Sequence, residues 1–93
     1  MANIGKFKIH KTGWVKLEDV IKERISDFAF KSGTAYLFQP NHFCRICIKA
    51  ATPTDPKEGF DLASKEKVTY THVEGTTLYI DSVDGELYVN ISE

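Results

Sequence analysis

The chain has 93 residues, of which 42% are hydrophobic and 27% charged, so it can build one hydrophobic core and is too short for two. Its 12 Lys and Arg nearly balance its 13 Asp and Glu, and the formal net charge of −1 excludes the global attraction to nucleic acid or anionic membranes that strongly basic proteins have. No apolar segment approaches the roughly 20 residues of a spanning helix, and the N-terminus has no apolar signal-peptide core. We therefore expect a single domain, residues 1–93, made and folded in a cytoplasm.

The segment KFKIH near the N-terminus alternates apolar and basic side chains. Phe7 and Ile9 would lie on one face of a β-strand and Lys6 and Lys8 on the other, because successive side chains of a strand point to opposite faces. Lysine on a sheet edge discourages pairing with other chains, so we predict an edge strand. Together with Lys11, the same residues could bind single-stranded nucleic acid by base stacking.

Residues 17–28 carry apolar side chains at helical spacing. The stripe consists of Leu17, Val20, Ile21, Ile25 and Phe28. It predicts an α-helix of two to three turns, with acidic residues early and basic residues late, as the helix dipole prefers. The segment from Gly13 to Ile21 could instead be extended. Trp14, the only tryptophan, is interpreted as a core or interface anchor near the base of this stripe.

The middle of the chain predicts short strands separated by turns. Residues 28–30 alternate as one such strand, which a turn at residues 31–33 closes. Two segments rich in β-forming residues follow, 34–40 and 42–50. Turn chemistry at residues 39–41 predicts that these two segments pair as a hairpin.

The last third predicts a three-stranded meander after a loop at residues 51–59, where two prolines and a glycine interrupt the chain. Asp84-Gly85 is typical of a type I′ hairpin turn, and a three-residue loop with Gly75 in left-handed geometry would form the other hairpin. On this register, the predicted core residues are Val68, Tyr70, Leu78, Ile80, Leu87, Val89 and Ile91. The predicted solvent face carries Tyr79, Asp81, Tyr88 and Asn90.

Both cysteines, Cys44 and Cys47, lie in one predicted strand. Three residues of strand separate their Cα atoms by roughly 10 Å and turn their side chains to opposite faces, whereas a disulfide spans at most about 7 Å. No turn residue lies between them and there is no second cysteine pair, so we predict two free, buried cysteines rather than a metal or redox site. A site that combines Cys44 with His42, His10 or His72 remains an alternative.

Tyr79 and Tyr88 would share the solvent face of adjacent strands with Asp81 and Asn90. Tyrosine and asparagine are suited to binding contacts, so this face is interpreted as a contact surface, a solvated surface or a sugar site. Alternatively, a helix or another sheet covers it. We predict that Trp14, Tyr79 and Tyr88 make protein contacts. No catalytic residue, metal site or cofactor is predicted.

The chain also resembles a class of small proteins encoded among the structural genes of tailed bacteriophages and prophages. The resemblance rests on the order of the segments GWVKLEDVI, SGTAYLFQPN, ATPTDPKEGFDL, VEGTTLYI and VNISE. It implies a small β-rich virion or virion-assembly component that binds copies of itself or neighbouring proteins, in the bacterial cytoplasm or in the virion. The resemblance assigns no site residue.

We therefore expect a mainly β fold, a small antiparallel sandwich or barrel of about six strands with one short N-terminal helix. The expected function is non-enzymatic, by protein–protein contacts in phage or prophage assembly, with a possible homo-oligomer. The alternative is a small β-barrel that binds single-stranded nucleic acid or carbohydrate.

Overall fold

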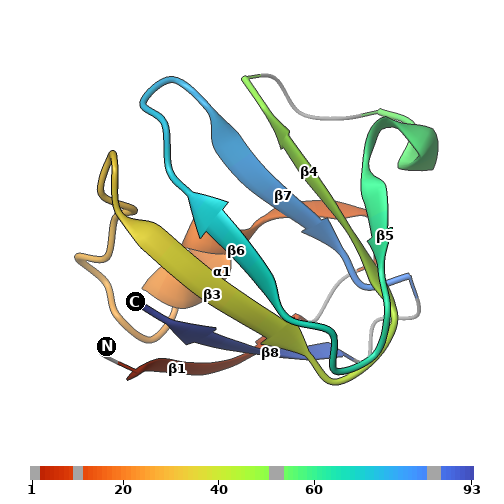
Figure 1. Ribbon diagram of the computed structural model, residues 1–93, viewed down its shortest axis with the longest axis horizontal. Helices are drawn as coiled ribbons and strands as arrows, with labels where there is room; N and C mark the ends of the chain where they lie inside the picture. Colours follow the sequence, from red (N-terminus) through yellow and green to blue (C-terminus); the bar gives the residue numbers. More distant parts are fainter. Residues whose placement is uncertain (1–2, 10–11, 51–53, 84–86) are drawn as a thin grey trace.

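The computed structural model describes residues 3–9, 12–50, 54–83 and 87–93, whose arrangement Figure 1 shows. These residues form eight β-strands, one α-helix and one short 3-10 helix. The elements are β1 (Asn3–Ile9), β2 (Trp14–Lys16), α1 (Leu17–Lys22), β3 (Ala35–Pro40), β4 (Cys44–Lys49), η1 (Pro56–Glu58), β5 (Phe60–Leu62), β6 (Val68–Thr71), β7 (Thr77–Asp81) and β8 (Leu87–Ser92). The predicted mainly β class with a short N-terminal helix is confirmed, whereas six strands was too low a number.

The strands form two four-stranded sheets, which we call sheet A (β1-β8-β3-β6) and sheet B (β2-β7-β4-β5). The pairs β1–β8, β2–β7, β3–β6 and β4–β5 are those of one long antiparallel hairpin with β1 to β4 as one arm and β5 to β8 as the other. Successive strands of each arm alternate between the sheets, so the hairpin is rolled into the eight-stranded jelly-roll arrangement. The sheets do not close into a barrel, so the fold is sandwich-like.

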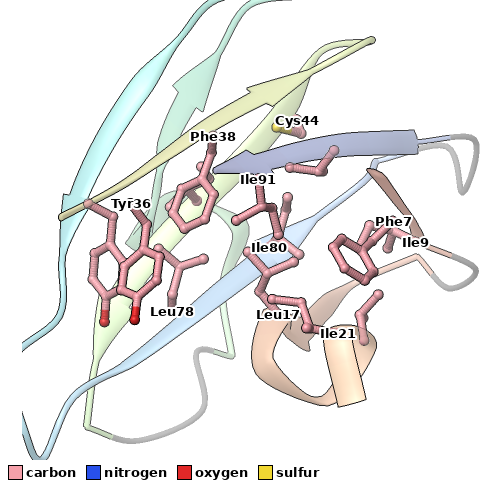
Figure 2. Packing of buried hydrophobic residues seen from close by; sticks show 14 of the residues in the cluster. Phe7, Ile9, Leu17, Ile21, Tyr36, Phe38, Cys44, Leu78, Ile80 and Ile91 are labelled. Carbon is pink, nitrogen blue, oxygen red and sulfur yellow. The ribbon is translucent and has the colours of Figure 1, made fainter. Parts of the chain in front are cut away.

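The core lies between the two sheets and takes buried side chains from both of them (Figure 2). Helix α1 adds Leu17 and Ile21, which pack near Phe7 and Ile9 of β1. The core residues predicted for the last third are buried, with Val68 partly buried against them. Alternation along each strand therefore predicts which side faces inward.

The predicted C-terminal meander is wrong, because its three strands are divided between the sheets. β7 lies in sheet B, whereas β6 and β8 lie in sheet A. Ile80 faces Val15 and Ile46, and Val89 faces Phe7 and Pro40, instead of each other. Two facing sheets bury the same alternate side chains as a hairpin does, so alternation cannot distinguish them. The predicted Asp84-Gly85 turn lies outside the described residues, and Gly75 has the expected positive φ of +89°.

The predicted hairpin of residues 34–50 is also wrong, because β3 lies in sheet A and β4 in sheet B. Pro40 ends β3 opposite Val89 instead of forming a hairpin turn, and its carbonyl accepts a hydrogen bond from Lys65 N (2.8 Å). Residues 28–30 do not form a strand. Phe30 instead packs edge-on against several aromatic rings, which holds this segment in place without a ladder. The turn at residues 31–33 is confirmed.

The observed helix is shorter than the two to three turns predicted. α1 ends at Lys22, and its buried residues are Leu17, Val20 and Ile21. The alternative, an extended segment from Gly13 to Ile21, is confirmed only for the first part of that segment, because Trp14–Lys16 forms β2. No helix in the described part of the chain has the length and apolar character needed to cross a membrane.

Candidate binding face

Of the three predicted contact residues, Tyr79 is in the interior. It is 2% exposed and lies in β7 between Lys16 of β2 and Cys47 of β4. The prediction that Tyr79 and Asp81 lie on a solvent face is therefore wrong, since Asp81 is only 6% exposed. Tyr79 is not available as a surface contact in the folded chain.

Segment 54–59 explains this burial, because it contacts residues on the outer face of sheet B. Trp14 Nε1 donates a hydrogen bond to the carbonyl of Asp55 (3.3 Å). Cys47 Sγ contacts the carbonyl of Glu58 at 3.4 Å. Gly59 lies so close that a Cβ there would be 2.5 Å from the Trp14 ring. Trp14 thus anchors a segment of its own chain on the outer face of sheet B, and it is not among the residues of the described core.

Tyr88 is the one predicted contact residue that stays on the surface. It lies on the outer face of sheet A with its side chain 38% exposed, the largest exposure of the three. Lys6 Nζ and Lys8 Nζ lie 5.4 and 5.7 Å from the centre of its ring. Such cation–π contacts at exposed sites contribute about 0.5–1 kcal/mol each. An aromatic ring flanked by two cations is thus available to a partner.

The backbone around Tyr88 explains why these side chains meet. Tyr88 N donates to Asn41 Oδ1 (2.8 Å), and Tyr88 O accepts from Asn41 N (3.0 Å), so both backbone groups point away from β1. Lys8 and Tyr88 are therefore a non-hydrogen-bonded antiparallel pair, in which side chains approach most closely. Lys6 faces Asn90, and Asn90 faces Gln39 of β3. We call the group Lys6, Lys8, Gln39, Tyr88 and Asn90 the Tyr88 face.

The cations of the Tyr88 face have no carboxylate partner within 4 Å among the described residues. The same is true of Arg24, which follows α1. Arg24 Nη1 donates to the carbonyl of Lys6 (2.6 Å), and its guanidinium lies 5.2 Å from the Phe7 ring centre. Three cations that have no carboxylate within 4 Å among the described residues lie near an exposed tyrosine, and this arrangement favours an anionic partner.

Among the described residues, the cysteines and histidines do not assemble into a site. Cys44 and Cys47 are both free and buried, as predicted, with Cys44 in the core and Cys47 under segment 54–59. Burial, with a smaller contribution from Asp81, raises the pKa of Cys44 to about 12, which leaves it an inert thiol at neutral pH. His42 is exposed, and His72 Nδ1 contacts Tyr70 Oη at 2.5 Å. Within the described ranges there is no group of three potential metal ligands.

The sequence points to Lys6, Lys8, Tyr88 and Asn90 of the Tyr88 face, but not to Gln39 or to the supporting contacts of Arg24 and Asn41. Lys6, Lys8 and Tyr88 were singled out in separate arguments, but their proximity depends on pairing of the two ends of the chain. Arg24 was assigned only to a helix, and Asn41 only to a turn. No local pattern marks either residue as a neighbour of β1 or β8. Lys11 and His10 lie outside the described residues.

Comparisons with protein-family models, with curated proteins and with solved structures found no match to this chain.

Proposed function

We propose that this protein is a non-enzymatic binding component that docks an acidic surface of another protein on its Tyr88 face. The observation that carries the proposal is the exposed Tyr88 ring between two lysines that have no carboxylate within 4 Å among the described residues. Tyrosine is enriched at protein contacts, and complementary charge steers and orients a partner.

The proposed biological setting is the assembly of a phage or prophage virion, as the sequence resemblance implies. Jelly rolls occur in viral capsid domains, which is an analogy of fold and supports the setting without assigning a function. The protein would work through contacts with other virion proteins.

The test places a photo-crosslinking residue at Tyr88 in cells that encode the protein and carry assembling particles. A control crosslinker at Thr71 lies on the same sheet and is also exposed, but β8 and β3 separate β6 from the lysines of β1. We expect a protein adduct at position 88, present in purified particles, and none at position 71.

The crosslinked partner is then purified and titrated with wild-type protein and with the variant Lys6→Glu/Lys8→Glu. Charge reversal is expected to weaken binding at least about tenfold, because it sets like charges against an acidic surface. Equal adducts at positions 71 and 88, or unchanged binding by the charge-reversal variant, would show that the Tyr88 face is not the docking surface.

Single-stranded nucleic acid is a second candidate, because cations around an aromatic ring also suit stacked bases and phosphates. It predicts that a fluorescently labelled oligonucleotide binds with an affinity that falls steeply between about 50 and 200 mM salt and is lost in Tyr88→Ala. Absence of binding at the lower salt concentration would remove this candidate. Such binding would use a sandwich and not a closed barrel, since the two sheets are separate.

A further inference from the structure

Strand β1 forms one edge of sheet A. It pairs with β8 on one side, and no described strand pairs with its other side (Figure 1). The backbone groups of Tyr88 point away from β1, so those of its partner Lys8 point away from β8, toward the free edge. The carbonyl of Lys6 points to the same edge, since it accepts the hydrogen bond from Arg24. Lys6 and Lys8 therefore present backbone donors and acceptors outward, as a strand does before another pairs with it.

A groove of about 180 Å³ lies next to this edge. Its lining residues are Lys6, Phe7, Lys8, Val20, Glu23, Arg24 and Tyr88. Phe7 and Val20 are buried and give it an apolar base. Three of the lining side chains are cations and only Glu23 is acidic, so the charge of the groove is positive. Beside the free backbone there is thus a concave surface with apolar and basic parts.

We propose that an extended acidic segment of a partner protein adds to the free edge of β1 as a further strand of sheet A. This rests on the proposed function above and names how the partner binds. Successive side chains of an added strand point to opposite faces, as in other strand-addition complexes. Carboxylates at alternate positions would lie near Lys6, Lys8 and Tyr88, and small apolar side chains at the intervening positions would lie toward Val20. The expected partner segment therefore alternates acidic and small apolar residues.

A second copy of the chain does not fit this edge through its own β1. Such pairing would place the lysines of two β1 strands side by side, and like charges on adjacent strands are destabilising. The bond from Arg24 to the Lys6 carbonyl also occupies the edge in the free protein. An incoming carboxylate would compete for Arg24 and release this carbonyl for the new ladder.

The test uses a blocked synthetic heptapeptide of alternating Glu and Val, with a control peptide of the same composition in which Glu and Val form two blocks. Binding is measured by NMR titration against the wild-type protein. Only the alternating peptide is expected to bind. Failure of the alternating peptide to bind, or equal binding of both peptides, overturns the proposal.

The variants Lys8→Ala and Lys8→Pro separate the side chain from the backbone. Both lose the ammonium group, but only Lys8→Pro loses the outward N–H, and proline is tolerated on edge strands. We expect Lys8→Pro to bind the alternating peptide about tenfold more weakly than Lys8→Ala, the effect of one lost ladder hydrogen bond. Equal affinities overturn strand addition while leaving side-chain docking on the Tyr88 face intact. The proposed function fails separately, if charge reversal leaves binding of the crosslinked partner unchanged.

A second measurement needs no substitution at position 8. Amide hydrogen exchange at Lys6 and Lys8 of the wild type is expected to slow when the alternating peptide is bound, because these N–H groups become ladder donors. Unchanged exchange at both amides under saturating peptide overturns the proposal, whatever the folding of Lys8→Pro. The proposal is also overturned if an oligonucleotide displaces the peptide and neither ligand protects these amides. That result would identify the groove as a site for anions in general.

Discussion

Asp81→Ala is expected to destabilise the fold strongly, because this buried carboxylate links the end of β7 to two neighbouring segments. Its Oδ1 accepts hydrogen bonds from Gly13 N (3.1 Å) and Val83 N (2.9 Å). Bonds to charged groups contribute about 1.5–3 kcal/mol each, so removing both costs about 3 kcal/mol after allowance for partly buried donors. The contact from Arg45 Nη1 to Oδ2 is long, at 3.9 Å, and adds little, because Arg45 also contacts Asp61 at 3.3 Å.

Asp61→Ala is the matched control, because it removes the other carboxylate of Arg45. The Asp61 side chain is 68% exposed, and exposed salt bridges contribute about 0–1 kcal/mol. The free energy of unfolding of both variants is measured by urea denaturation, with m-values equal to that of the wild type as the condition for comparison. A loss of about 3 kcal/mol would also lower the melting temperature by roughly 12–24 °C. If Asp81→Ala costs no more than Asp61→Ala, the backbone bonds to Asp81 do not stabilise this corner and the reasoning is wrong.

Two further predictions concern segment 54–59. Gly59→Ala is expected to cost about 3 kcal/mol in urea denaturation, because its Cβ would lie 2.5 Å from the Trp14 ring and 2.6 Å from the carbonyl oxygen of Ile46. Gly75→Ala meets nothing within 4 Å and is expected to cost about 1 kcal/mol for its positive φ. Equal costs would show that both the Trp14 ring and the backbone at Ile46 move aside freely. The salt bridge from Lys49, with two backbone N–H groups, lowers the pKa of Glu58 from 4.5 to about 2. A group whose pKa is lower in the folded state than in the unfolded state stabilises the fold at pH values above its unfolded-state pKa. The difference in unfolding free energy between wild type and Glu58→Gln is therefore expected to shrink as pH falls from about 4.5 to about 2. A difference that stays constant over this range, measured by urea denaturation at each pH, would contradict the assignment.

The inward faces of the strands could be predicted from the sequence, and their partners could not. The alternation of Leu87, Val89 and Ile91 in β8 indicates that one side of the strand is buried. Strands of sandwiches and of hairpins both have this property. Pairing in this fold joins segments far apart in the chain, as Phe7 with Val89 shows. A local turn signal such as Asp84-Gly85 favours a hairpin between neighbours and says nothing about a facing sheet.

The two predicted tyrosines differ for a reason that no alternation pattern contains. Tyr79 and Tyr88 both occupy the outward side of their strands, so both were predicted on a solvent face. Segment 54–59 contacts sheet B through Trp14 and Cys47, and none of its described hydrogen bonds reaches Tyr88. The two prolines of residues 51–59 predict a loop, but the direction in which a loop folds back depends on tertiary contacts.

The same topology places four residues of the Tyr88 face on β1 and β8, the first and last strands. On β1, the residues of this face and the residues of the core point to opposite sides. Phe7 and Ile9 point into the core, and loss of β1 would remove them and expose β8 as a new edge. Lys6 and Lys8 point outward and make no described ion pair, so their substitution leaves the core intact. We therefore expect changes to outward residues of β1 to alter the proposed binding at little cost in stability, and truncation of β1 or β8 to disrupt both binding and folding. Because of this separation, a loss of binding in variants of Lys6 or Lys8 can be attributed to the Tyr88 face and not to unfolding.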